Sequence, residues 1–498
     1  MKIHAPLIPI VVCLILGIVL GEMLDEWSKG FILLIPLLFV TVFLRHFPRW
    51  QTAGIWACVV VLGAMLSSMK HKALSCEWPQ EPTTQEIVVS SETVVKEKAV
   101  VFDALISGQQ RKIKCRVAKD ETSKQITIGD RLLVHSTIRP IHQYQDGHFD
   151  YQRYMLCHEF SGETFVGRTH WQWQERLLAG LSLTERLKLR ALCWRHQLLA
   201  HYRQWGFDQE AYGVIAAMTL GDKSQLDTTL KDTYAIAGAS HVLALSGLHL
   251  MIIYAFITLF TGWWRFRTLS QILTVLPIWA FAFLVGLSPS VVRSAFMISV
   301  YALLSLGYRE RMSVNTLAFT AIVMLVMNPF ALYDIGFQLS FMAVLAIVLL
   351  NPLFSQIIPL HVLQRHRWLN AVWGLTTVSL AAQIGTAPLV IYYFGRFATY
   401  FLLSNYVVIP LATLILNLAL ACVCCFWWVG LQQLLTTALM TVVSFMNQIL
   451  TFIAHLPKSS VEDIRLSTLQ LYLIYIIIGC LWVVLSLYRK NVKHLAKV

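Results

Sequence analysis

The chain has 498 residues, of which 57% are hydrophobic and only 13% are charged, and its mean hydropathy is +0.61. Soluble globular proteins carry about a quarter charged residues, so this composition excludes a soluble globule, a disordered tail or a disulfide scaffold for most of the chain and indicates a polytopic α-helical membrane protein. The formal net charge of +13 has two explanations that composition does not separate: an excess of Lys and Arg in cytoplasmic loops, or attraction of a polyanion such as nucleic acid.

Three apolar runs open the chain, at about 6–24, 31–44 and 52–69, and define an N-terminal membrane region at 1–70. A helix needs about 20 apolar residues to cross a bilayer. The first run has no small-residue cleavage site after it, so we expect an anchor and not a removed signal peptide. The loop after it is acidic and the next loop is basic. Because basic loops stay in the cytoplasm, we expect the N-terminus inside and the segment after residue 70 outside.

Residues 71–173 are dense in charges and predict a β domain. Runs rich in Val, Ile and Thr alternate with period 2, which is typical of strands. Five short strands suit a small barrel, and the OB-fold is the commonest candidate of this size. We therefore expect one inserted, extracytoplasmic, OB-like β-barrel domain. HFDYQRYMLCHEF, between the last two strands, predicts a turn and a short helix. The strands are expected in EIVVSSETVV, AVVFDALIS, RKIKCRVAK, ITIGDRLLVHSTI and ETFVG.

The β domain carries one basic stripe, formed by Lys112, Lys114 and Arg116, which alternate with apolar residues and therefore share one face. An OB-fold can bind a single strand beside a basic groove by stacking bases on aromatic rings. However, 71–173 holds 13 Lys and Arg against 13 Asp and Glu, so the stripe is either a DNA contact or a solvated strand face. The same choice, between stacking bases and packing, holds for the nearby aromatics Tyr144, Phe149, Tyr151 and Tyr154. A disulfide among Cys76, Cys115 and Cys157 also stays open.

Residues 174–239 predict helices at the membrane surface. The part at 175–204 is basic and amphipathic, which is typical of a helix lying on a bilayer. The part at 208–238 predicts two short helices around GDKSQLD.

Residues 240–498 form a second membrane region. Basic loops recur at every second position, at 265–267, 309–311, 365–367 and in the tail, which places the C-terminus in the cytoplasm. The total is about twelve spans, although a re-entrant helix could replace a span in 401–455. The expected spans are 240–261, 271–287, 290–306, 313–330, 335–351, 369–394, 401–428, 433–455 and 469–487.

Arg293, Asp334 and Arg396 stand alone in long apolar tracts. Charges inside a membrane are costly and often functional, but each of these could instead end a helix and reach the interface. In the expected register they lie at the outer side, as does His241. We expect an external vestibule in which Arg293 binds phosphate, and in which Asp334 pairs with a cation such as Arg293 while Gln338 extends the polar path.

Ser246 and His249 are three residues apart and therefore neighbours on one helix face. They could form a nucleophile and base, cap or pack a helix, or line a pathway. No acid lies nearby in sequence to orient the base.

Motifs for energy conversion and metal chemistry are absent from the sequence. It has no G-x-x-x-x-G-K-[ST], no H-E-x-x-H, no G-x-S-x-G and no two histidines two apart. These absences argue against a self-powered pump and a two-metal nuclease. We expect no ATPase or nuclease activity, no cofactor and no metal.

Five strings together resemble the ComEC family of natural-competence DNA-uptake proteins, and the resemblance covers essentially the whole chain. They are GDKS at 221–224, SHVLALSGLHL at 240–250, SPSVVRSAFM at 288–297, DIGFQLSF at 334–341 and RFATYFLLSNYVVIP at 396–410. The resemblance implies passage of single-stranded DNA across the bacterial cytoplasmic membrane. The residues it implies for the channel path, together with Arg396, are Asp222, His241, Ser246, Gly247, His249, Arg293, Asp334 and Gln338.

Many members of that family carry a C-terminal metallo-β-lactamase-like domain. This chain stops about ten residues after its last expected span, so the resemblance does not imply nuclease activity here. Expected partners are single-stranded DNA, membrane lipids, an extracytoplasmic DNA receptor, a separate nuclease and a cytosolic DNA-translocating ATPase. The alternatives are a small-molecule secondary transporter, although no internal repeat of the kind common in transporters is found, and an intramembrane hydrolase using Ser246 and His249. The oligomeric state stays open.

Overall fold

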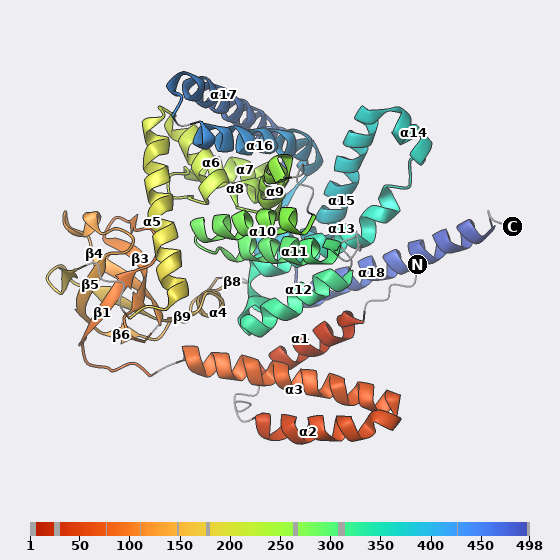
Figure 1. Cartoon of the computed structure of the whole chain (residues 1–498), viewed down its shortest axis with the longest axis horizontal. Helices are drawn as coiled ribbons and strands as arrows, with labels where there is room; N and C mark the ends of the chain where they lie inside the picture. The colour runs from red at the N-terminus through yellow and green to blue at the C-terminus, as the bar shows by residue number, and fades with distance from the viewer. Residues whose placement is uncertain are drawn as a thin grey trace. The chain divides into compact units, whose positions relative to one another are not determined.

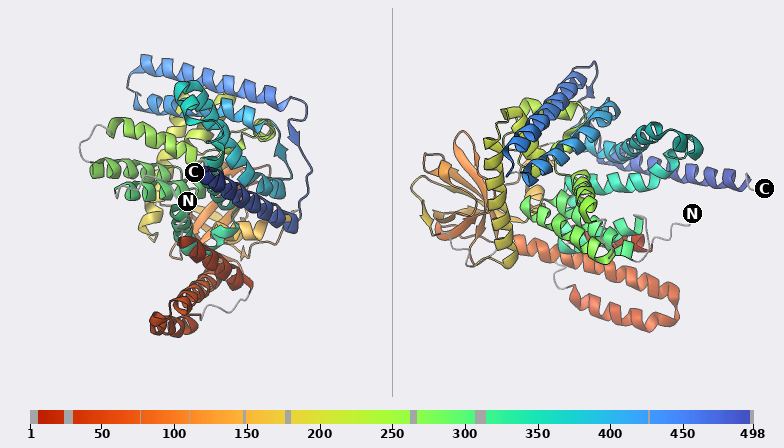
Figure 2. Two further views of the ribbon diagram at one scale, coloured as in Figure 1. Left: turned by 90° about the vertical axis from the view of Figure 1, so that its right-hand side faces the viewer. Right: turned by 45° about the horizontal axis from the view of Figure 1, so that its top comes forward.

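The computed structural model of the chain is shown in Figures 1 and 2 and describes residues 6–23, 30–75, 77–109, 111–146, 149–175, 180–261, 267–306, 314–425 and 427–495. Cys76 and most of the basic loops expected at 265–267 and 309–311 lie outside the described residues. The chain divides into two compact units. The first comprises 1–197, 281–287 and 314–337, and the second comprises 198–280, 288–313 and 338–498.

The described helices are those of a membrane protein. Six are long and apolar enough to cross a bilayer, six further apolar helices are shorter, and every span expected from the sequence overlaps one of them. The long ones are α3 (Pro48–Leu74), α13 (Ile335–Phe354), α15 (Arg367–Phe394), α16 (Phe401–Cys424), α17 (Val429–Ala454) and α18 (Thr468–Leu495). The shorter ones are α1 (Leu7–Met23), α2 (Phe31–Phe43), α9 (Gly247–Thr261), α10 (Arg267–Leu284), α11 (Pro289–Leu306) and α12 (Val314–Met327).

Helices α1 and α3 of the first unit pack with their backbones in close contact. A Cβ atom built on Gly17 would lie 2.1 Å from the carbonyl oxygen of Val60, and one built on Gly21 would lie 2.4 Å from that of Ala64. Two glycines four residues apart are a common means of close helix approach in membranes. This contact requires glycine at both positions.

The first unit also contains the β domain, whose largest sheet has the strand order β10-β5-β1-β3-β4-β9-β6, with β2 added beside β3. All pairs are antiparallel except β4 with β9. The inward side chains of the alternating strands form one apolar core, which includes Phe102, Ile113 and Leu132. The strands are β1 (Thr83–Val89), β2 (Val94–Val95), β3 (Ala99–Ile106), β4 (Lys112–Ala118), β5 (Arg131–Ser136), β6 (Ile138–Arg139), β9 (Phe160–Val166) and β10 (Trp171–Gln174), and β7 (Gln145–Asp146) pairs separately with β8 (Phe149–Asp150).

The sheet does not close into a barrel. Strand β5 pairs with β1, whereas β6, which follows after Thr137 alone, pairs with β9 at the far end of the strand order. The sheet therefore curls back on itself without a continuous ladder. Five strands coincide with the predicted ones, and the predicted short helix is α4 (Tyr151–Cys157). The closed-barrel part of the prediction is wrong, because a two-residue strand is too short to complete the ladder.

The basic amphipathic segment forms α5 (Leu183–Gln204), which runs beside the strands (Figure 1). Leu189 and Leu192 of this helix pack with Val88 and Leu105 on the outer side of the sheet. Arg195 donates to Glu92 at 3.2 Å. One face of α5 is thus occupied by protein, while Leu183, Leu187 and Trp194 remain exposed.

In the second unit, the helices α6 (Gln209–Leu220) and α7 (Thr228–Ile236) lie where the sequence predicts two short helices. Tyr234 donates to Asn447 at 2.7 Å and joins α7 to α17. Gly385 of α15 would place a Cβ atom 2.4 Å from that of Ala346 in α13. The remaining elements are α8 (Ser240–Leu243), α14 (Leu360–Arg365), β11 (Phe397–Ala398) and β12 (Ser460–Val461).

Candidate functional site

A helix break in the second unit forms the centre of the candidate site. Helix α8 ends at Leu243, the chain is non-helical at 244–246, and α9 begins at Gly247. His249, in the first turn of α9, accepts a hydrogen bond at Nδ1 from the backbone N–H of Ser246 at 3.3 Å, and Ser246 Oγ lies 2.9 Å from the same nitrogen. The bond from the Ser246 N–H is one half of a capping box, with imidazole in the position usually held by Glu or Gln.

The same contacts test Ser246 and His249 as a nucleophile and base. Because Nδ1 accepts the backbone N–H, the imidazole proton resides on Nε2. That atom is enclosed, and the backbone carbonyl of Val242 lies within hydrogen-bonding reach of the ring. A catalytic triad orients its histidine with a carboxylate, whereas a backbone carbonyl takes that place here, so the geometry favours a helix cap.

Helix α11 holds the break in place through its serine face. Ser290 Oγ donates to the carbonyl of Leu245 at 2.6 Å. A Cβ atom on Gly247 would lie 3.0 Å from Ser294 Oγ, so Gly247 permits the close approach. Arg293 lies between these two serines in sequence and is 3% exposed.

The GDKS turn packs against the other side of the break. Gly221 has φ +74°, and a Cβ atom there would lie 2.6 Å from Leu245 Cδ1. Asp222 is buried and accepts from the backbone N–H of Ser224 at 2.9 Å. The sequence motifs at 221–224, 240–250 and 288–297 therefore meet around the helix break, while His241 lies in α8 at its start.

Asp334 and the helix α4 form a separate cluster in the first unit. Asp334 ends the short helix η4 (Pro329–Tyr333) and accepts from the N–H of Phe337 at 2.9 Å, which caps α13. Its other carboxylate oxygen lies 4.0 Å from Nε2 of His158. We expected Asp334 to face a cation such as Arg293, and the group that faces it is the imidazole of His158, which sequence reasoning did not single out.

Helix α4 makes several further contacts with η4 and with the ends of α1 and α3. Cys157 Sγ donates to the carbonyl of Phe330 at 3.1 Å, and Asn328 donates to the carbonyl of Cys157 at 3.0 Å. Arg153 pairs with Glu22 at 2.7 Å and lies over the ring of Tyr333, and Lys70 pairs with Glu159 at 2.5 Å. We call these contacts the α4 anchor. They join the β domain to three membrane helices or their connections.

Gln338 and Arg396 have protein partners in the second unit. Tyr393 donates to Gln338 Oε1 at 2.9 Å. Arg396 pairs with Glu462 at 2.9 Å across the β11–β12 ladder. The carboxylate that neutralises Arg396 is 66 residues away in sequence, which is why Arg396 looked isolated.

The family model described as "Competence protein" matches residues 218–488, which is more than half of the chain and includes all the motifs around the helix break. The chain belongs to this family. It is 28% identical over 277 residues to "ComE operon protein 3" of Bacillus subtilis (strain 168), an alignment that covers 55% of the chain and 33% of the relative.

Two uncharacterized relatives show weaker similarity. One is from Aquifex aeolicus (strain VF5), with 29% identity over 198 residues, 39% of the chain and 44% of that protein. The other is YcaI of Escherichia coli (strain K12), with 23% identity over 299 residues, 58% of the chain and 37% of that protein. The chain thus spans less than half of the length of these relatives. No solved structure matches the chain.

The basic stripe of this Competence-family chain lies on one face of β4, and each of its three side chains pairs with a carboxylate. Lys112 and Lys114 both pair with Asp103, at 3.3 and 2.7 Å, and Arg116 pairs with Glu163 at 2.9 Å. Burial raises the pKa of Asp103, but the two lysines outweigh burial and hold that pKa below its usual value. Burial lowers the pKa of Lys112 even beside this carboxylate. The lysine end of the stripe is therefore an internal ion cluster.

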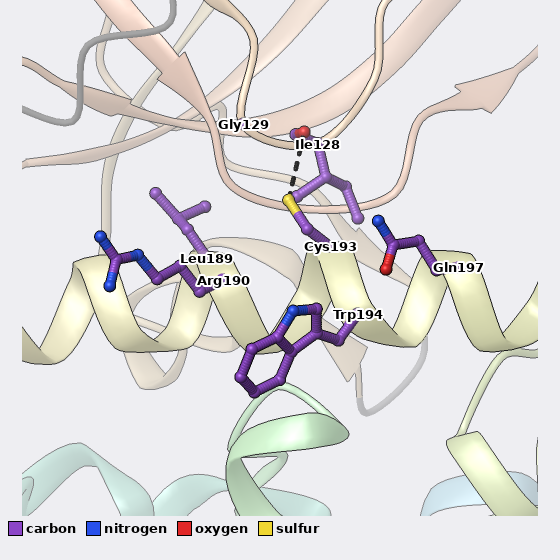
Figure 3. Close-up of a pocket in the computed structure, with 7 residues that line it drawn as sticks. All are labelled: Ile128, Gly129, Leu189, Arg190, Cys193, Trp194 and Gln197. Carbon is purple, nitrogen blue, oxygen red and sulfur yellow. Dashed lines mark hydrogen bonds between the residues drawn. The ribbon is translucent and has the colours of Figure 1, made fainter.

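Helix α5 lies close to that lysine end. Burial lowers the pKa of Lys188 on α5, and the nearby Lys112 lowers it further. A pocket of about 490 Å³ lies between α5 and the turn at Ile128 and Gly129, and Figure 3 shows the residues that line it. Cys193 Sγ donates across its floor to the carbonyl of Ile128 at 3.7 Å. Helix α5 therefore packs on the β domain with a gap along part of the contact.

The remaining predicted residues of the β domain have mixed environments. Cys115 and Cys157 are free thiols, and burial raises the pKa of each to about 12. Tyr144 and Tyr154 are both exposed, and the ring of Tyr154 is tilted against that of Phe149, with the ring centroids 5.6 Å apart. Among the described residues, no group of three His, Cys, Asp or Glu side chains could hold a metal ion.

Proposed function

We propose that the chain forms a membrane channel that carries single-stranded DNA across the bacterial cytoplasmic membrane during natural competence. The observation that carries this proposal is the convergence of the family's motif strings on one helix break, within the region matched as Competence protein. The similarity to ComE operon protein 3 supports it.

The break suits the translocation of a polyanion. Discontinuous helices in transport proteins present helix N-termini and free backbone groups to a substrate, and a buried arginine can replace the hydration of phosphate with charge-assisted hydrogen bonds. We assign Arg293 to that role. Asp222, Ser246, Gly247 and His249 shape the break around it, and His241, Asp334, Gln338 and Arg396 continue the proposed path.

The proposed topology has about twelve spans, with both termini in the cytoplasm and the β domain outside. The overlap between the expected spans and the apolar helices supports it. The strand order β5-β1-β3-β4-β9, with one parallel pair, supports an OB-like domain. Such a domain would receive the strand before it enters the channel.

The proposed partners follow from what the sequence lacks. Without a phosphate-binding loop, the chain needs the proton gradient or a cytosolic DNA-translocating ATPase to move the strand. A separate nuclease would supply the single strand, and an extracytoplasmic receptor would deliver DNA to the β domain. Lipids surround the spans.

A hydrolase based on Ser246 and His249 is less favoured, although their 2.9 Å contact is the first requirement for it. A serine-directed probe is expected not to label Ser246 under conditions in which it labels a serine hydrolase added to the same sample as a control. If the chain were a small-molecule transporter, its deletion would leave DNA uptake unaffected.

The test measures cytoplasmic uptake of labelled DNA in a deletion strain complemented with variants. Arg293→Ala is expected to abolish uptake without changing membrane insertion, and Arg293→Lys to restore it only in part, because a point charge lacks the planar fork. Arg367→Ala, at an exposed arginine that begins α15, is the matched control and should take up DNA normally. Normal uptake in the deletion strain itself would refute the proposed function.

A further inference from the structure

Strand β9 carries a large aromatic side chain that faces away from the sheet core. Phe165 is 61% exposed, whereas its neighbours Thr164 and Val166 are buried. An exposed phenylalanine near the end of a paired strand adds nothing to the core. It offers a free aromatic face, which is the surface on which an unpaired base can stack.

The strand register places one arginine directly beside this ring and a second arginine beside the next outward residue of β9. Phe165 is paired with Arg116 of β4, and Glu163, the next outward residue of β9, is paired with Arg139 of β6. Arg168 follows in the turn after β9. All three arginines are exposed. Arg139 forms no ion pair with any residue that the structure describes.

This end of β4 differs from the lysine end. Lys112 and Lys114 share the carboxylate of Asp103 and lie near α5. Arg116 is the most exposed member of the stripe, at 47% of its side chain, and its partner Glu163 is also the cross-strand neighbour of Arg139. These two arginines outnumber the one glutamate beside Phe165.

We propose that Phe165, with Arg116 and Arg139, forms a base-stacking and phosphate-binding subsite for single-stranded DNA on the outer face of β4, β9 and β6. This deepens the proposed function and rests on it for the identity of the strand. The ring stacks on one base, and the two guanidinium groups bind the flanking phosphates. Paired bases in a duplex cannot present a face to the ring, so the subsite selects single strands.

The chemistry fits a nucleic acid strand better than a lipid surface. Insertion into a bilayer needs a contiguous apolar face, but the outward positions beside Phe165 hold Arg116 and Glu163. Isolated aromatics bordered by cations are instead the pattern of single-strand binding surfaces.

The test uses the full-length protein in lipid nanodiscs and a fluorescent oligothymidylate, titrated across a salt series. Phe165→Leu keeps the apolar bulk but removes the aromatic face, and is expected to weaken binding by about tenfold. Phe165→Trp should bind at least as tightly as the parent. Arg116→Gln and Arg139→Gln should each lower the slope of log affinity against log salt by about 0.7, the value for one phosphate contact on a single strand.

Trp173→Leu is the matched control, because Trp173 is an exposed aromatic on β10 without the flanking arginines, and it should bind like the parent. Equal affinity of Phe165→Leu and the parent would overturn the subsite, and so would an unchanged salt slope in both arginine variants. If Phe165→Leu binds as tightly as the parent while deletion of the gene still abolishes DNA uptake, the subsite alone is refuted. Phe165-dependent binding together with normal uptake in the deletion strain would instead refute the proposed function.

Discussion

At the scale of single residues, His249 can be tested as a helix cap separately from any chemistry of its ring. The imidazole accepts the N–H of Ser246, and a glutamine amide oxygen can accept the same donor. We predict that His249→Gln keeps the thermal stability of the parent in detergent, whereas His249→Ala loses about 1 kcal/mol, the usual loss for a missing cap. Equal losses in the two variants would show that the ring does more than cap α9.

The position of Asp103 makes the stability of the β domain depend on acid. Its folded pKa lies below the usual value, chiefly because Lys112 and Lys114 outweigh the effect of burial. The ionised carboxylate therefore stabilises the folded state at neutral pH, and this contribution is lost as the pH falls from about 3.9, the ordinary value, through the lower folded pKa.

We predict that Asp103→Asn destabilises the β domain by about 2 kcal/mol, because two partly buried ammonium groups lose their only shared carboxylate. Hydrogen exchange of the β3 and β4 amides in the full-length protein measures this loss, and it should shrink as the pH is lowered toward 3. Glu121→Gln, which removes an exposed carboxylate that pairs with its near neighbour Lys124, should leave these amides unchanged at every pH.

At the scale of elements, the close approach of α1 and α3 depends on Gly17 and Gly21. The hydropathy of the sequence predicts the two helices but does not indicate this contact. We predict that Gly21→Ala destabilises the protein by about 1–3 kcal/mol, as overpacking does, because the added Cβ atom would lie 2.4 Å from a backbone oxygen of α3. The melting temperature in detergent measures the change. Gly479→Ala is the control, since a Cβ atom on α18 meets nothing within 4 Å.

Periodicity predicted which elements form, but not what covers them. Apolar length predicted the helices, and alternation predicted β1, β3, β4, β5 and β9. Two-residue strands such as β6 carry no period, so the open end of the sheet could not be predicted. The amphipathic pattern of α5 showed an apolar face, but a membrane and a sheet would satisfy that face equally, and the leucines proved to pack on the sheet.

The candidate site was predictable where its residues are close in sequence. Ser246 directly precedes α9 and His249 lies in its first turn, and their contact follows from that three-residue spacing. Asp334 with His158, and Arg396 with Glu462, are joined across long stretches of chain, and such pairs leave no local pattern. The exposed face around Phe165 depends on the parallel pairing of β4 with β9, which places a residue from the fifth strand beside one from the third.

At the scale of the whole molecule, the α4 anchor decides how the β domain is attached to the membrane helices of the first unit. Arg153 and Glu22 provide its clearest test, because their charges can be exchanged. We predict that Arg153→Glu increases proteolytic cleavage of the connection at 75–82 and that adding Glu22→Arg restores protection. Restoration by the double variant is expected because only a direct pair can be rescued by exchange. Loss of protection in both variants would mean that Arg153 acts through Tyr333 alone.

If the proposed function holds, the α4 anchor would also limit the volume that an incoming DNA strand must search. A domain held only by the connection at 75–82 would wander over roughly 15 Å, the coil dimension of eight residues. Strand β9 begins at Phe160, three residues after α4 ends at Cys157. The α4 anchor therefore fixes the direction in which β9 runs away from the membrane helices of the first unit. A base held on β9 would therefore be delivered at one position and in one orientation each time, so that every further nucleotide begins its passage from the same starting point.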